Sequence, residues 1–188
     1  MSSIRKNKLI TILTLLGYFA VMPYAAAQTY TAKNIQFNIF SSTPIEDIKA
    51  ASYTGVAVLV AQKQEITIQV AIKSLEFDKK LMQEHFNENY MESDKYPLAK
   101  FKGSIEPKID WAKDGDYPVT VKGSLWIHGI EQPRTINGKI TIKNKVVSIA
   151  TAFNVNCIDH HIKIPSIMFA KIAEVIQVKV QGNLNPLN

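Results

Sequence analysis

The sequence predicts an all-β protein, a closed antiparallel β-barrel of about eight strands with one or two short helical excursions. Two observations lead to this fold class. Apolar residues recur at every second position in most segments, which is the period of a strand with one buried face. Short polar stretches separate these segments, so consecutive strands can pair as antiparallel neighbours.

The clearest segment is 117–142, YPVTVKGSLWIHGIEQPRTINGKITI, which has the pattern of a β-hairpin. Its two arms share one apolar face, which contains Val119, Val121, Gly123, Leu125, Ile127, Ile136, Ile140 and Ile142. Gly123 carries no side chain on this inward face, so we expect free space there for a ligand or for a neighbouring ring such as Phe101 or Phe153. A hairpin alone is marginally stable, so the rest of the chain must cover this face.

The segments before the hairpin follow in order. Residues 32–40 alternate and predict the first strand. Thr43, Pro44 and Glu46 then have the spacing of a helix N-terminus, so we expect a short helix that ends at about Ala51. The next strands are predicted over 55–61, 65–77 and 98–105.

Between the last two of these strands, residues 78–92 change to a helical period and predict a helix or helical loop. After the hairpin, alternation over 146–157 predicts another strand. Residues 158–173 are irregular around Pro165, with a short helix expected after Ser166, and 175–184 predict the last strand.

Closure of these strands into a barrel is favoured because it removes the unpaired edges of a large open sheet. A β-sandwich is the alternative that the pattern leaves open. A barrel of about eight strands is either filled by its own side chains or just wide enough for a slender ligand. Since the inward residues are mostly Ile, Val and Phe, such a ligand would have to be apolar.

The N-terminus predicts a secretory signal peptide over residues 1–27, which leaves one domain over 28–188. Three basic residues precede an apolar run over 9–22, and Ala25 and Ala27 have the spacing of a signal peptidase site. The alternative is an uncleaved membrane anchor, but the run is shorter than the roughly 20 residues that span a bilayer. We therefore expect a periplasmic or secreted protein.

The charge of the remaining chain excludes one class of partner. Three of the 22 Lys and Arg residues lie in the predicted signal peptide, which leaves 19 against 16 Asp and Glu, a net charge of +3. The lysines are scattered singly rather than clustered, so nucleic-acid binding has no support. Cys157, the single cysteine, shares strand parity with Phe153 and Val155, which predicts a small buried hydrophobe rather than a reactive thiol.

Several segments carry a family resemblance. They are 74–77 (SLEF), 81–93 (LMQEHFNENYMES), 95–97 (KYP), 101–103 (FKG), 121–130 (VKGSLWIHGI) and 162–167 (IKIPSI). In this order the sequence resembles the YceI-like family of lipocalin-like, polyisoprenoid-binding proteins. The resemblance implies an eight-stranded, lipocalin-like antiparallel barrel that holds a long prenyl chain in an apolar tunnel. The chain departs from the family in a longer segment over 85–93 and in Asp159-His160-His161, where other members often have an Arg.

Nine inward apolar residues are the predicted lining of this tunnel: Phe37, Ile68, Val70, Phe101, Val121, Leu125, Ile140, Phe153 and Val178. The expected function is non-enzymatic binding or carriage of a polyisoprenoid or isoprenoid-quinone-like lipid, which would allow transient contact with a membrane. The two irregular segments, 78–92 and 162–173, are predicted lids at the mouth of the tunnel. The alternative is a secreted structural or protein-interaction module, in which the same residues fill a packed barrel and no ligand binds.

Metal binding and catalysis have little support in the sequence. His85, His128, His160 and His161 lack the tight spacings of metal ligands, and neighbours such as His160 and His161 would point to opposite faces of a strand. We expect His128 to hydrogen-bond loop backbone. The sequence has no nucleophile elbow and no glycine-rich phosphate loop. We expect no catalysis and no cofactor apart from a bound isoprenoid lipid; a lipid-modifying enzyme that uses Glu84 and His85 is the alternative.

Overall fold

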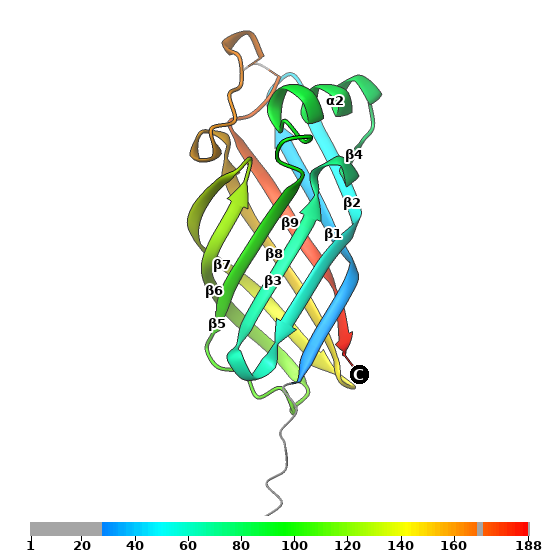
Figure 1. The fold of residues 1–188 in the computed structure, drawn as a ribbon, viewed down its shortest axis with the longest axis vertical. Helices are drawn as coiled ribbons and strands as arrows, with labels where there is room; N and C mark the ends of the chain where they lie inside the picture. Colours follow the sequence, from blue (N-terminus) through cyan, green and yellow to red (C-terminus); the bar gives the residue numbers. More distant parts are fainter. Residues whose placement is uncertain (1–27, 169–170, 188) are drawn as a thin grey trace, which may run out of the picture.

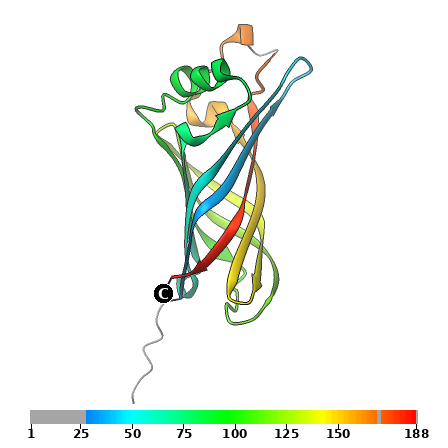
Figure 2. The same ribbon diagram turned by 90° about the vertical axis from the view of Figure 1, so that its right-hand side faces the viewer.

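Eight long antiparallel strands wind around one axis and close into a barrel (Figures 1 and 2). The structure is a computed structural model that describes residues 28–168 and 171–187; the predicted signal peptide, 1–27, lies outside the described residues. The long strands are β1 (Thr29–Ser42), β2 (Asp47–Val60), β3 (Glu65–Ala71), β5 (Leu98–Glu106), β6 (Gly115–Ile127), β7 (Ile130–Lys143), β8 (Val146–Asn156) and β9 (Val175–Pro186).

Hydrogen bonding runs around the whole barrel in the order β1-β9-β8-β7-β6-β5-β3-β2, and β2 pairs with β1 to close the ring. The short strand β4 (Glu76–Phe77) pairs with Ala50 and Ala51 of β2, beyond the end of β3. Residues 65–77 thus form one strand interrupted by a 3-10 turn at Ile72–Ser74. The predicted barrel is confirmed, and the sandwich alternative is wrong, because the ring of strands has no break at which two sheets could separate.

The two ends of the barrel differ. One, called here the α2 end, carries helix α2 (Lys80–His85), the β1–β2 and β6–β7 turns and the 3-10 turns Cys157–His160 and Ser166–Met168. The helix continues as a π-helical turn over Phe86–Tyr90, which confirms the predicted helix in 78–92. The other end, called the loop end, carries the β2–β3, β5–β6 and β7–β8 connections.

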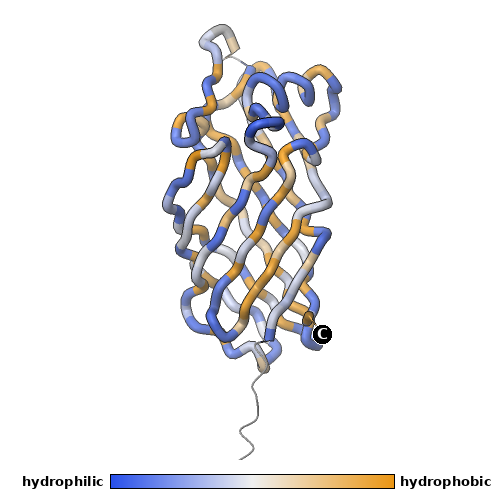
Figure 3. The backbone as a smooth tube through the Cα atoms, viewed as in Figure 1, coloured by the Kyte–Doolittle hydropathy of each residue, from blue (hydrophilic) through white to orange (hydrophobic). Residues whose placement is uncertain are grey.

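Apolar and polar residues alternate along the strands, as the colours of the tube show in Figure 3. The apolar faces point inward, and at the loop end they pack into a buried cluster that includes Tyr30, Ile35, Leu59, Val147 and Leu184. In the described part of the chain, no helix has both the length and the apolar character that crossing a membrane requires.

The predicted helix at 43–51 is wrong. Residues 47–51 belong to β2 and pair with β1, for example Asp47 with Ser42 and Lys49 with Phe40. The polar groups behind the helix prediction do interact, since the backbone N–H of Glu46 donates to Oγ1 of Thr43 over 3.1 Å, but they close the β1–β2 turn. The pairing with β1 extends to the end of β2, and it outweighs a local preference that a short turn satisfies equally well.

Candidate functional site

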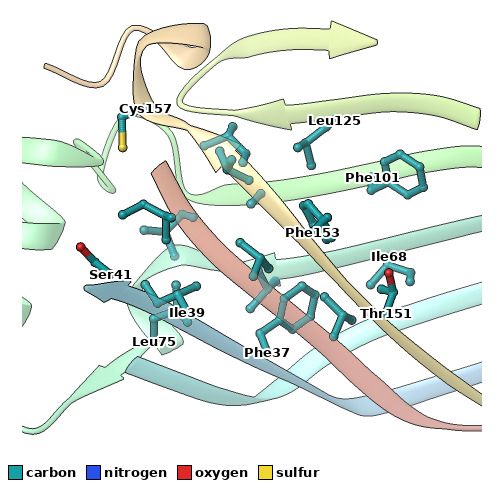
Figure 4. A pocket seen from close by; sticks show the side chains of 18 of the residues that line it. Phe37, Ile39, Ser41, Ile68, Leu75, Phe101, Leu125, Thr151, Phe153 and Cys157 are labelled. Carbon is teal, nitrogen blue, oxygen red and sulfur yellow. The ribbon is translucent and has the colours of Figure 1, made fainter. Parts of the chain in front are cut away.

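An apolar cavity of about 290 Å³ occupies the barrel interior toward the α2 end. All eight long strands contribute to its wall, and the nine predicted lining residues all lie on it. Figure 4 shows Phe37, Phe101 and Phe153, from β1, β5 and β8, among the side chains that surround this space. Sequence reasoning could place these nine on the inward side because strand parity alone decides which residues face inward. Contact of these residues with a ligand stays a prediction.

The α2 end contributes wall residues that were not among the nine. From the helical segment and the residues after the Cys157–His160 turn these are Met82, Phe86, Tyr90, Ile162, Ile164 and Met168. The two predicted lid segments thus both reach the cavity. The helical spacing of Met82, Phe86 and Tyr90 was the available signal, but the period of a helix does not tell which neighbour its apolar face covers.

Polar groups on the wall have protein partners or lie at the mouth. The hydroxyl of Ser41 is buried and accepts a hydrogen bond from the backbone N–H of Ala173 over 2.9 Å. Glu46, at the α2 end, pairs with Lys79 over 2.8 Å. His85 and Lys171 are exposed wall residues of the two lid segments. A ligand in the barrel would therefore meet mostly hydrocarbon along its length, apart from residues such as Thr151, and more polar groups at the α2 end.

Cys157 lies on the wall near the α2 end and is buried, as predicted. Burial, with a smaller contribution from the charge of Glu174, raises the pKa of its thiol to about 11. The thiol is therefore protonated at neutral pH and behaves as a small apolar group.

A polar cluster beside the cavity ties the Cys157–His160 turn to the β6–β7 hairpin. Arg134 donates to Asp159 over 2.7 Å, and this hydrogen bond is the main reason that the pKa of Asp159 is lowered. His128 hydrogen-bonds the backbone oxygen of His160 over 3.1 Å, which confirms the predicted backbone contact, and reaches a carboxylate oxygen of Glu92 over 2.8 Å. These contacts hold the α2-end segments against the barrel.

His160 is fully buried in this cluster, with Nδ1 3.3 Å from the backbone oxygen of Ile130. Burial lowers the pKa of its imidazole, so the neutral form is favoured. Among the residues that the structure describes, its Nε2 finds no hydrogen-bond partner. Within residues 28–168 and 171–187, no group of three or more His, Cys, Asp or Glu side chains is placed to hold a metal ion.

The expected free space at Gly123 is a prediction that the structure contradicts. Gly123 of β6 lies directly opposite Gly103 of β5, and the two backbones approach closely there. A Cβ added at Gly123 would lie 2.0 Å from the backbone oxygen of Lys102 and 2.5 Å from Cα of Gly103. The missing side chain makes room for the neighbouring strand, and neither an aromatic ring nor a ligand could enter this space.

Comparison with known proteins agrees with this architecture. A model of the YceI-like domain matches residues 27–184. A comparison with curated protein sequences finds no match.

Three solved structures share the fold. A polyisoprenoid binding domain from Saccharophagus degradans has a TM-score of 0.71 at 12% identity, covering 86% of this chain and 99% of its own. BcnA from Burkholderia cenocepacia has a TM-score of 0.67 at 14% identity, covering 80% and 95%. A YCEI protein from Campylobacter jejuni has a TM-score of 0.56 at 14% identity, covering 72% and 81%. The family model spans most of the chain and the fold agrees with it, so this protein belongs to the YceI-like family.

Proposed function

We propose that this protein binds a long apolar lipid inside the barrel and carries it without chemical change. The observation that carries the proposal is the cavity, whose wall is built from apolar side chains of every long strand. An isoprenoid chain, either a polyisoprenoid or the side chain of an isoprenoid quinone, is the first candidate. The family membership supports this choice, as does the Saccharophagus degradans neighbour, which is described as a polyisoprenoid binding domain.

An apolar wall can supply binding free energy without charged groups. Large ligands realise about 0.3 kcal/mol per non-hydrogen atom, so about 15 buried carbons contribute roughly 4–5 kcal/mol and each further five buried carbons about 1.5 kcal/mol. The affinity of the protein for a lipid therefore grows with the number of carbons that the wall covers.

The same wall argues against catalysis. Of its nucleophile-type groups, the thiol of Cys157 is buried and protonated, the hydroxyl of Ser41 accepts a backbone hydrogen bond, and the hydroxyl of Thr151 donates to the backbone oxygen of Asn137. His85 is exposed at the mouth and belongs to helix α2, which carries neither Cys157 nor Ser41. We therefore propose a binding protein and not a lipid-modifying enzyme.

We further propose that the mature protein starts at Gln28 after export to the periplasm or beyond. The basic and apolar pattern of residues 1–27 supports this, together with the start of β1 at Thr29, directly after the proposed cleavage position. The N-terminal sequence of protein recovered from a cell envelope fraction tests the proposal. Protein that retains residues 1–27 would contradict it.

Lipid binding is tested first by extracting natively purified protein with organic solvent and analysing the extract by mass spectrometry. An isoprenoid at near-stoichiometric amount is the expected result. Delipidated protein is then titrated with a fluorescent prenyl lipid. A protein that yields no lipid and does not bind the probe would overturn the proposal in favour of a packed structural module.

A pair of matched variants locates the binding. Ala99→Trp places an indole on the cavity wall and is expected to abolish probe binding, whereas Ala71→Trp makes the same change at an exposed position on the neighbouring strand. Circular dichroism shows whether each variant is folded. Equal binding by both folded variants would place the probe outside the barrel and contradict the proposal.

A further inference from the structure

We propose that the sealed loop end of the barrel limits the chain that this protein holds in a single extended pass to about 12–16 main-chain carbons, or three to four isoprene units. The inference rests on the proposed function and adds a specificity-determining element to it. The element is a group of buried residues, called here the plug, which consists of Tyr30, Ile35, Leu59, Trp111 and Leu184.

The plug leaves no passage at the loop end. Tyr30, Ile35, Leu59 and Leu184 are each 0% exposed, and the ring of Trp111 packs at 6.1 Å from that of Tyr30. None of the five residues lies on the cavity wall. The cavity therefore stops above them.

The side chain of Gln64 fastens the loop that contributes Trp111. Gln64, in the β2–β3 turn, donates through Nε2 to the backbone oxygen of Ile109 over 3.1 Å and accepts through Oε1 from the backbone N–H of Ile109 over 3.0 Å. These two hydrogen bonds fix the β5–β6 loop over the end of the barrel. The seal is thus a packed and hydrogen-bonded part of the fold.

Strand pairing locates the floor of the cavity. Ile66 lies on the wall, and its direct neighbour across the β2–β3 pair is Leu59 of the plug. Ile149 also lies on the wall, and its partner on β9 is Gly182, against which Ile35 packs. The plug therefore begins one side chain below the last wall residues.

The distance from this floor to the lids follows from strand geometry. Wall residues extend from Val119 to Ile127 on β6 and from Ile149 to Val155 on β8. At about 3.3 Å per residue these stretches are roughly 26 and 20 Å long, which a strand tilt of about 40° reduces to roughly 20 and 15 Å along the barrel axis. An extended chain with carbon–carbon bonds of about 1.5 Å advances about 1.25 Å per main-chain carbon, so 12–16 main-chain carbons, about 15–20 carbons of a prenyl chain, fill this depth.

A much longer chain must therefore fold back on itself or leave its remainder outside the α2 end. Either way, added carbons make few new contacts with the wall.

The test measures the affinity of delipidated full-length mature protein for prenyl alcohols of 10, 15, 20 and 40 carbons, in competition with a fluorescent prenyl probe. We expect the Kd to fall about tenfold from 10 to 15 carbons and by less than about threefold from 20 to 40 carbons. A Kd that keeps falling about tenfold per five carbons up to 40 carbons would overturn the length limit. Failure of every alcohol and of the probe to bind would overturn the proposed function as well.

Two variants move the floor in opposite directions. Leu59→Ala deepens the cavity below Ile66 and is expected to raise the gain in affinity from 20 to 40 carbons to about tenfold. Val119→Phe places a larger apolar side chain on the wall at the bottom of the cavity and so raises the floor. This variant should bind the 15-carbon chain no more tightly than the 10-carbon chain. A length profile that is the same in Val119→Phe as in the unmodified protein would overturn the inference even if Leu59→Ala does not fold.

Discussion

Replacement of Gly123 by Ala is expected to destabilise the barrel strongly, although it adds a single methyl group. The added Cβ would lie 2.0 Å from the backbone oxygen of Lys102 and 2.5 Å from Cα of Gly103, and neither backbone atom can move without the strand. Real Cβ atoms essentially never approach another heavy atom within 3.0 Å. β5 and β6 must therefore separate by about an ångström at this point, which strains the ladder hydrogen bonds on either side of the Gly103–Gly123 pair.

Overpacking of a well-packed interior costs about 1–3 kcal/mol, and a clash with backbone belongs at the upper end or above it. A loss of about 3 kcal/mol in the free energy of unfolding corresponds to a fall of about 6–12 °C in Tm for a domain of this size. Gly115→Ala is the matched control on the same strand. The nearest atoms to its added Cβ are on the ring of Tyr117, at 3.4 Å, so its Tm should change by no more than about 4 °C.

Thermal and urea unfolding, followed by far-ultraviolet circular dichroism, compares both variants with the unmodified protein. The expected result is a large fall in Tm and in the urea midpoint for Gly123→Ala alone. A Tm within about 2 °C of the unmodified protein for Gly123→Ala would show that the strands separate easily, and would refute the close approach as the reason for glycine at this position.

Three further predictions concern the side chains of His160, Cys157 and Gln64. Lowering the pH from 7 to 5 should lower the urea midpoint, because burial depresses the pKa of His160 in the folded protein. Below about pH 6.5 the histidine of the unfolded chain takes up a proton before the buried one does. The contribution of neutral His160 to the free energy of unfolding is therefore complete above about pH 6.5 and is lost as the pH falls toward the depressed pKa. His160→Gln should remove most of this fall, and an equal fall in the variant would contradict the assignment. Native Cys157 should resist alkylation at pH 8, where about one thiol in a thousand is ionised at a pKa of about 11, and should react fully in denaturant; mass spectrometry measures both. Gln64→Ala should cost about 1–3 kcal/mol in urea unfolding and shift the fluorescence of Trp111 to the red as its loop loosens, whereas an unchanged spectrum would mean that Gln64 does not hold the seal.

The family resemblance and nine residues of the wall were accessible from sequence because they depend on local pattern. Alternation fixes the side of a strand on which a residue lies, whichever strand becomes its neighbour. Phe37, Ile68 and Phe153 were placed on the wall in this way, before their partners were known. The helix in 78–92 was predictable for the same reason, since its period belongs to the segment itself.

Other features depend on which segments meet. Thr43 and Glu46 satisfy the same hydrogen bond in a strand turn as in a helix start, and only the pairing of β2 with β1 decides between them. A glycine at position 123 is compatible both with empty space beside it and with a neighbouring backbone. Only the strand register, which places Gly123 opposite Gly103, shows that the backbone is there.

The sequence by itself determined the strand period, the inward residues and therefore the apolar character of the interior. The tertiary structure decided where that interior is filled and where it is hollow. Tyr30 and Leu59 have the same inward parity as wall residues, yet they pack against Trp111 and Leu184 and seal one end of the barrel. The difference arises because packing depends on side chains that converge from separate strands and loops, and no single segment contains that information.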